Sequence, residues 1–90
     1  MTMIKSFRSR ALKRYWEKGD NRRINPEHFA KVKRILRALD VAKNPGDMNI
    51  PGFKFHPVGK EFSVWVTGNW RITFGFEDGD AANVDYQDYH

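Results

Sequence analysis

Three runs of alternating apolar and polar residues fill the last third of the chain. Every second residue is apolar in the sets Phe62, Val64, Val66; Trp70, Ile72, Phe74, Phe76; and Ala82, Val84, Tyr86. Successive side chains of a strand point to opposite faces of a sheet, so this period predicts three strands, each apolar on one face. Gly, Asn and Asp between the runs predict hairpin turns. The sequence therefore predicts a small antiparallel sheet with one apolar face.

The lengths of the hairpin turns follow from the need to keep apolar residues on one face. A two-residue turn at Asp78-Gly79 would pair Phe74 with Asn83, which mixes the two faces of the sheet. We therefore expect three-residue loops. The predicted loops are 67–69 and 78–80, with the pairs Val66–Trp70, Phe76–Ala82, Phe74–Val84 and Ile72–Tyr86.

The first half of the chain carries two helical patterns that can cover the apolar face. The first starts at Arg8, with Ala11, Leu12, Tyr15 and Trp16 on one side and Gly19 as its C-terminal cap. Asn25-Pro26-Glu27 predicts the start of the second helix, and Asn44-Pro45-Gly46 predicts its end. Its core stripe is Phe29, Val32, Ile35, Leu36 and Leu39, and His28 is expected to face solvent in its first turn. Residues 3–7 and 53–56 alternate and predict two further short strands, the second at a sheet edge because Pro57 follows.

These patterns predict an α+β fold, with two N-terminal helices packed on one face of a small, mainly antiparallel sheet. Its 90 residues predict a single domain over 1–90. The chain has no cysteine, which excludes disulfides, a thiol nucleophile and a cysteine metal site. No apolar run is long enough to span a membrane and no signal-peptide pattern is present, so we expect a soluble, cytoplasmic protein without a membrane partner.

Positive charge is concentrated in the predicted helices. Residues 1–44 carry 13 Lys and Arg against four Asp and Glu, whereas residues 45–90 carry three against seven. The basic half indicates a polyanion or an acidic protein as the partner, and a solvated helix face is the alternative. The basic residues that we single out for phosphate contacts are Arg8, Arg10, Lys13, Arg14, Lys31 and Arg34.

The polar face of the predicted sheet carries groups suited to metal-independent phosphodiester transfer. Its predicted members are Lys54, His56, Ser63, Trp65, Thr67, Arg71 and Thr73, and Tyr89 has the same parity. RNA supplies its own nucleophile, the 2′-hydroxyl, so an enzyme needs two proton-transfer groups and a cation for the phosphorane. Imidazole suits the protons, arginine suits the phosphate, and Trp65 and Tyr89 suit base stacking.

Each of these residues also has a structural alternative. His56 is then a surface strand residue, Arg71 pairs with Asp85 or Gln87 across the sheet, and Trp65 is a packing residue. The last three residues, 88–90, are then a polar tail. In a regular strand Asp88 and His90 point to the helix side, so the tail would have to leave strand geometry to act beside His56. A metal site of His56, Asp88 and His90 is a further alternative, although no spacing supports it and no metal or other cofactor is predicted.

Several strings resemble HigB toxins of the RelE/ParE superfamily of toxin–antitoxin systems over essentially the whole chain. They are Met-Ile-Lys-Ser-Phe at 3–7, Lys-Phe-His-Pro at 54–57, Gly-Asn-Trp-Arg-Ile-Thr-Phe at 68–74 and Asp-Tyr-His at 88–90. The resemblance implies a RelE-like, microbial-ribonuclease-like fold. It also implies an endoribonuclease that cleaves mRNA in the A site of the 70S ribosome, and a HigA-type antitoxin partner through which alone operator DNA is contacted.

The same resemblance implies a set of site residues. His56, Arg71, Asp88, Tyr89 and His90 match the catalytic positions, and Lys60 is a displaced match to a family lysine. Lys54 and Trp65 join the basic residues above in the expected RNA contacts. Two rival functions remain open: a ParE-like poison of DNA gyrase without nuclease activity, and a module that binds RNA without cutting it.

Overall fold

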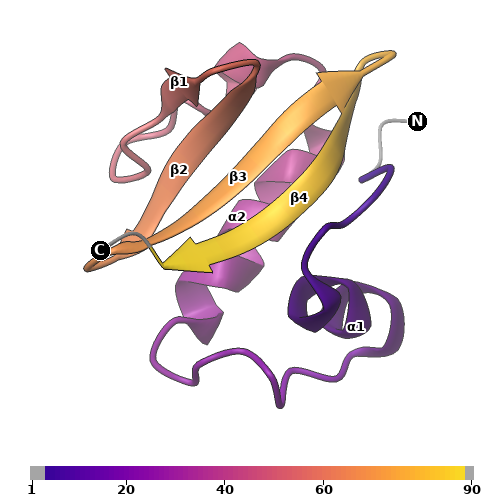
Figure 1. Ribbon diagram of the computed structural model, residues 1–90, viewed down its shortest axis with the longest axis vertical. Helices are drawn as coiled ribbons and strands as arrows, with labels where there is room; N and C mark the ends of the chain where they lie inside the picture. The colour runs from indigo at the N-terminus through magenta and orange to yellow at the C-terminus, as the bar shows by residue number, and fades with distance from the viewer. Residues whose placement is uncertain (1–3, 89–90) are drawn as a thin grey trace.

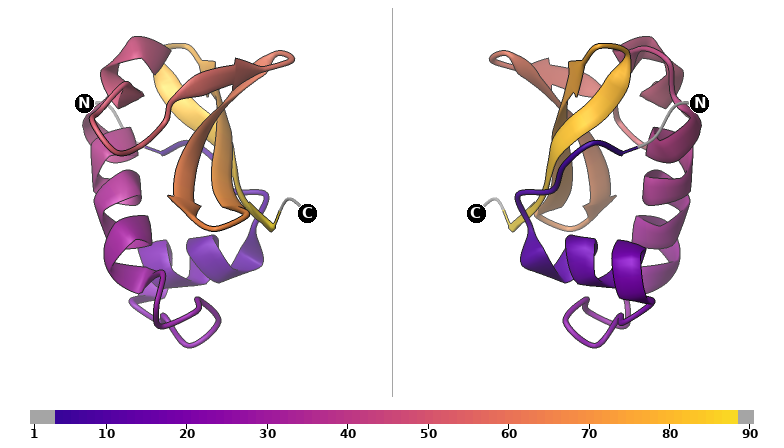
Figure 2. Two further views of the ribbon diagram at one scale, coloured as in Figure 1. Left: turned by 90° about the vertical axis from the view of Figure 1, so that its left-hand side faces the viewer. Right: turned by 90° about the vertical axis from the view of Figure 1, so that its right-hand side faces the viewer.

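The computed structural model describes residues 4–88, which form two α-helices, a 3₁₀ helix and one four-stranded sheet. The helices are α1 (Arg10–Lys18), α2 (Phe29–Val41) and η1 (Pro45–Met48), and the strands are β1 (His56–Val58), β2 (Glu61–Thr67), β3 (Trp70–Glu77) and β4 (Asp80–Asp88). Neighbouring strands are antiparallel in the order β1-β2-β3-β4. Figure 1 and Figure 2 show α2 along one face of the sheet, with no described helix over the opposite face. The predicted α+β fold is confirmed.

The chain before α1 runs beside β4 and does not form a strand of its own. Ile4 and Phe7 each make one isolated parallel bridge to β4. The backbone N–H of Arg8 then donates to Val84 O at 2.8 Å, which turns the chain toward α1. Residues 4–7 form no strand, so this part of the strand predicted over residues 3–7 is wrong. Residue 3 lies outside the described residues.

Both ends of α1 are capped by side-chain or backbone groups. The side chain of Ser9 accepts a hydrogen bond from the N–H of Leu12, which satisfies one free donor of the first turn. Gly19 adopts φ 72°, a left-handed conformation, and its N–H donates to Tyr15 O. The predicted glycine cap is confirmed, while the helix begins slightly later than the predicted Arg8.

The start of α2 differs from the sequence prediction. The side chain of Asn25 accepts from the N–H of Glu27 and forms a turn, so it does not cap the helix. The helix begins at Phe29 with His28 as its N-cap residue, and no side chain caps it. It ends at Val41, before the predicted stop signal.

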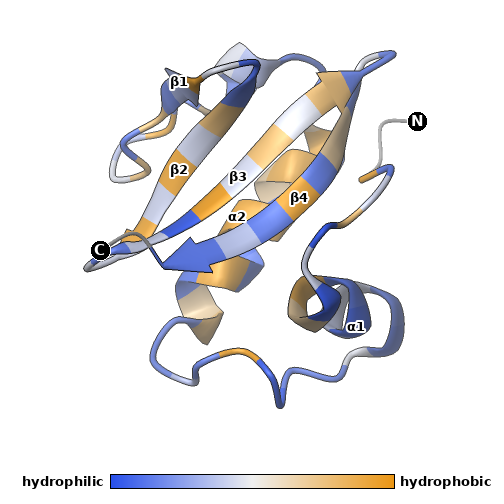
Figure 3. Cartoon of the chain, in the orientation of Figure 1, coloured by the Kyte–Doolittle hydropathy of each residue, from blue (hydrophilic) through white to orange (hydrophobic). Residues whose placement is uncertain are grey.

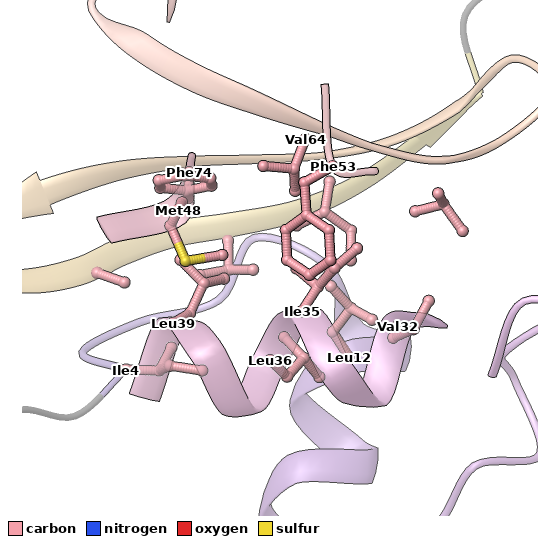
Figure 4. Close-up of a cluster of buried hydrophobic side chains, with 14 of the residues drawn as sticks. Ile4, Leu12, Val32, Ile35, Leu36, Leu39, Met48, Phe53, Val64 and Phe74 are labelled. Atoms are coloured by element: carbon pink, nitrogen blue, oxygen red, sulfur yellow. The ribbon is translucent and has the colours of Figure 1, made fainter. Parts of the chain in front are cut away.

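The apolar stripe of α2 packs against the inner face of the sheet. Figure 4 shows these side chains beneath the sheet, with Met48 and Phe53 beside them. The fully buried members of this core include Val32, Ile35, Leu36, Leu39, Val64, Ile72, Phe74 and Val84. Each such side chain contributes about 1.5–3 kcal/mol on transfer from water. The predicted core face is confirmed, and Figure 3 shows the alternating hydropathy along β2, β3 and β4 that produces it.

Each of the two long hairpins combines a two-residue turn with a β-bulge. Glu77 pairs with Asp80 and Thr67 pairs with Trp70, so the predicted three-residue loops are wrong. The register shifts by one residue close to each turn, between Thr73 and Gly75 in one hairpin and between Trp65 and Thr67 in the other. Beyond the bulges the predicted pairing is restored, as in Ile72–Tyr86, Val64–Ile72 and Phe62–Phe74. The bulge supplies the one-residue offset that we assigned to the loop.

The polar face of the sheet is only partly open to solvent. Ser63 and Thr73 are strand partners at its centre, and they are 0% and 3% exposed. Their expected solvent exposure is therefore wrong. Both are short side chains on central strands, and the next row of the same face carries the longer side chains of Trp65 and Arg71. Among the described residues, neither hydroxyl has a hydrogen-bond partner.

Candidate active site

His56 is the first residue of the edge strand β1 and is exposed. The predicted position at the sheet edge is confirmed, but the predicted bounds 53–56 are wrong, because Lys54 has φ 48° and this left-handed residue breaks the extended run. The Nδ1 atom of His56 lies 3.1 Å from the carbonyl oxygen of Lys54. A carbonyl only accepts, so Nδ1 donates in this contact and Nε2 of the neutral ring remains available to accept a proton.

A cluster of cations surrounds the indole ring of Trp65. The Nζ atoms of Lys54 and Lys31 lie 4.3 Å and 5.1 Å from the ring centroid. Arg34 lies beside them, with its guanidinium carbon 5.6 Å from the Phe53 ring. Burial, and then the charges of Arg34 and Lys54, lower the pKa of Lys31. The half-buried Trp65 is thus both a packing residue and part of a positively charged surface, and the structure brings four predicted RNA contacts together here.

Arg71 lies next to this cluster because it is the strand partner of Trp65. Its Nη1 donates to the carbonyl oxygens of Gly68 and Trp70, both at 3.3 Å. The Nε1 of Trp65 donates to the same Gly68 oxygen at 3.0 Å. Arg71 makes no ion pair with residues 4–88. The side chain of Asp85 instead accepts a hydrogen bond from the side-chain amide of Gln87. Pairing of Arg71 with Asp85 is therefore wrong, whereas Gln87, the other residue of that alternative, is the strand partner of Arg71.

The C-terminal tail begins at Asp88, the last residue of β4, which pairs with Trp70 and is exposed. His56 lies in the row of Ser63, Thr73 and Asp85. At strand spacings of about 4.8 Å and rises of about 3.3 Å, Asp88 is roughly 17 Å from His56 along the sheet surface. Tyr89 and His90 lie outside the described residues, so their predicted approach to His56 stays a prediction.

The remaining predicted RNA contacts are distributed over the surface. Lys60 is exposed in the turn between β1 and β2. Arg8 reaches the polar face, where its guanidinium makes an ion pair with Glu61 at 3.2 Å. The α1 residues Arg10, Lys13 and Arg14 line a separate basic cavity with Glu17, Lys18 and Arg23, about 260 Å³ in volume.

The structure also contains an aromatic cluster around a buried histidine that the sequence prediction missed. His28 is 4% exposed, so its expected solvent-facing position is wrong. Its Nδ1 contacts the hydroxyl of Tyr86, and its ring lies 5.2 Å from that of Trp70. Trp70 and Tyr86 share the helix-side parity of their strands, and this shared parity is the signal in the sequence that could have located a partner for His28.

Residues 4–88 contain neither a metal-binding cluster nor a membrane-spanning helix. No group of three or more His, Cys, Asp or Glu residues in this part of the chain is placed to hold a metal ion. No helix in the same part is long and apolar enough to cross a membrane.

Comparison with known proteins identifies the family. Residues 5–90 match the family described as the RelE-like toxin of the type II toxin–antitoxin system HigB. One relative, named Endoribonuclease HigB and found in Proteus vulgaris, is 38% identical over 92 residues, which cover 98% of this chain and 100% of the relative. Type II toxins act with an antitoxin partner, and nothing in these matches supports the gyrase-directed alternative. The chain therefore belongs to the HigB-like toxins, the RelE-like toxins of type II toxin–antitoxin systems.

Proposed function

We propose that this chain is an endoribonuclease that cleaves mRNA in the ribosomal A site and thereby inhibits translation. The observation that carries the proposal is the full-length match to a relative named as an endoribonuclease. The sequence offers an imidazole for proton transfer at His56 and a guanidinium for phosphate binding at Arg71. Residues 1–90 act in this proposal as a single toxin domain.

The proposed reaction is metal-independent attack of the 2′-hydroxyl on the adjacent phosphorus. One group removes the 2′-hydroxyl proton, the new P–O bond forms, and the bond to the leaving 5′-oxygen breaks as a second group donates a proton to it. The products are a 2′,3′-cyclic phosphate and a free 5′-hydroxyl. His56 and His90 are the two proton-transfer groups, and the available Nε2 of His56 suits either role. Arg71 stabilises the charged phosphorane, Tyr89 orients the nucleotide, and Asp88 orients the tail.

The message is held by the cationic surface beside these groups. Trp65, flanked by Lys54 and Lys31, offers an aromatic ring to a base and positive charge to the neighbouring phosphates. Arg34 and Lys60 extend this charge. On the polar face Arg8 also contacts the message, while the α1 residues Arg10, Lys13 and Arg14 bind phosphates of ribosomal RNA, an interaction that weakens with salt.

The partners follow from the same proposal. The substrate is mRNA on the 70S ribosome, so the toxin acts in the cytoplasm. Its inhibitor is a HigA-type antitoxin, and operator DNA is contacted only through that antitoxin.

Cleavage of ribosome-bound message tests the function. Cut sites are mapped by primer extension for wild type, His56→Ala, His90→Ala and the exposed control Lys43→Gln. General acid–base groups contribute about 10²–10⁴-fold, so we expect each histidine variant to lose that factor and the control to cut at the wild-type rate. Undiminished cutting by both histidine variants would contradict the site. Intact message together with gyrase-dependent DNA breaks would contradict the nuclease function itself.

A further inference from the structure

A cleft of about 440 Å³ lies where the connector between α1 and α2 meets the sheet. Arg22, Arg23, Asn25 and the rings of Trp70 and Tyr86 form most of its lining. This volume lies within the range of about 300–1,000 Å³ that is common for small-molecule sites. None of the residues assigned above to the message or to catalysis lines this cleft.

The aromatic wall of the cleft is held in place from behind. The Trp70 and Tyr86 rings are 4.7 Å apart with their planes tilted by 33°. The buried His28 contacts the hydroxyl of Tyr86, and its ring lies 5.2 Å from that of Trp70. Rings fixed in this way lose little freedom when a base stacks on them, which favours binding.

The two arginines of the cleft differ in how far their charge is neutralised. Arg22 is tied to Asp20, with Nε and Nη2 each 3.0 Å from a carboxylate oxygen. Arg23 is exposed and makes no ion pair with residues 4–88. Arg23 also lines the cavity on α1 and a third cavity of about 310 Å³ beside Arg14. It therefore joins the aromatic wall to the basic surface of α1.

The cleft adjoins the end of β3 at which two residues of the proposed site, Arg71 and Asp88, lie. Trp70 pairs with Asp88, so their Cα atoms are roughly 5 Å apart, and it directly precedes Arg71. Because Trp70 and Arg71 point to opposite faces, a strand of RNA that passes around the sheet end can contact both.

We propose that this cleft binds the nucleotide next to the cleaved position of the message, with its base on Trp70 and Tyr86 and its phosphate on Arg23. The proposal rests on the proposed endoribonuclease function. RNA fits better than an acidic peptide, because the cleft pairs a base-sized aromatic wall with the guanidinium of Arg23, which makes no ion pair with residues 4–88.

Photocrosslinking tests occupancy of the cleft without requiring catalysis. A message on the ribosome carries a 2′-O-methyl group at the cut position, and 5-iodouridine is placed in turn at each of the three nucleotides on either side. We expect one position to give an adduct on Trp70 or Tyr86. Adducts confined to Trp65 or to other residues would overturn the proposal.

Cleavage kinetics test the phosphate contact. Arg23→Gln should lower kcat/KM by about threefold to tenfold, the loss of one charge-assisted hydrogen bond, and Lys43→Gln should not. A neutral methylphosphonate at the flanking linkage should lower the wild-type value by the same factor and leave that of Arg23→Gln unchanged. If the variant and the methylphosphonate instead each lower kcat/KM and the two losses multiply when combined, Arg23 does not contact that phosphate.

Trp70→Leu tests the base contact, with an expected loss of about fivefold to a hundredfold against a message with a base in the flanking position. With an abasic nucleotide there, wild type and variant should cut at equal rates. If Trp70→Leu and Arg23→Gln instead weaken antitoxin binding and cut normally, the cleft is a protein interface and the proposal is wrong. Failure of wild type to cut an unmodified message would contradict the endoribonuclease function, while the crosslink would still report on the cleft.

Discussion

The guanidinium of Arg8 reaches across two strands of the sheet to the carboxylate of Glu61, with Nη2 3.2 Å from Oε2. The backbone of Arg8 is bonded to Val84 on β4, and Glu61 lies on β2. The Glu61 side chain passes over Gly75 on the strand between them, where an added Cβ would lie at an ordinary contact distance of 3.8 Å from Cγ of Glu61. The ion pair thus crosses the polar face and neutralises one cation of the proposed message-binding surface.

Glu61→Gln is expected to strengthen binding of message, because it frees the charge of Arg8. The KM for cleavage should fall by about twofold to fivefold, and its dependence on salt concentration should become steeper. The matched control is Glu77→Gln, which removes the same charge at the turn between β3 and β4. Equal KM values for the two variants would mean that Arg8 does not face the message.

Substitutions of Asn83 test the bulge in the β3–β4 hairpin, because this exposed residue has the left-handed φ of 54°. Asn83→Val should lower the free energy of unfolding by about 1–2 kcal/mol, since a β-branched residue is strained in this conformation. Asn83→Gly should change it by less. Urea denaturation measures both, and a valine variant as stable as the glycine variant would show that the bulge lies elsewhere.

Tyr86→Phe should destabilise the protein, because it removes the hydroxyl that contacts the buried Nδ1 of His28. A buried polar atom left without a partner costs about 1–3 kcal/mol. Tyr15→Phe is the control, since Tyr15 packs edge-on against Phe29 and that ring contact survives the change. Equal urea midpoints for the two variants would contradict the proposed pairing.

Asp20 makes stability depend on pH at the acid end. Hydrogen bonds from the side chain and backbone of Arg22, and then from Arg14, lower the pKa of Asp20 from its ordinary 3.8. A carboxylate with a lowered folded pKa stabilises the fold above its unfolded pKa, and this stability is lost as pH falls through the folded value. Asp20→Asn should therefore lower the urea midpoint at pH 7 and weaken its fall below about pH 4. Glu27→Gln, an exposed charge change nearby, should leave the acid dependence unchanged.

The sequence predicts the parts of this fold that depend on residue spacing. The stripe of α2 and the inner face of the sheet follow from periods of 3.6 and 2, because burial requires them. The turn lengths do not follow, since a two-residue turn with a bulge and a three-residue loop give the same pairing of Ile72 with Tyr86. Local signals also mislead at His28, where contacts with β3 and β4 bury a residue that helix-start rules place at the surface.

The candidate site is predictable in its members and less so in its arrangement. The parity of β2 and β3 correctly places Trp65 and Arg71 on one face as neighbours. The position of Lys31 beside them depends on how α2 packs against the 52–54 segment, where Lys31 Nζ donates to Gly52 O at 3.0 Å. No periodicity within one element contains that information, because it arises from packing between elements.

The carbonyl oxygen of Gly68 accepts from both Trp65 and Arg71, and Gly68 itself has φ 54°. A single peptide plane therefore sets the position of a ring suited to bases and of a charge suited to phosphates. The two groups cannot be tuned independently, because rotation of this plane removes a hydrogen bond from both. A substitution at residue 68 is therefore expected to change the proposed base contact and the proposed phosphate contact together.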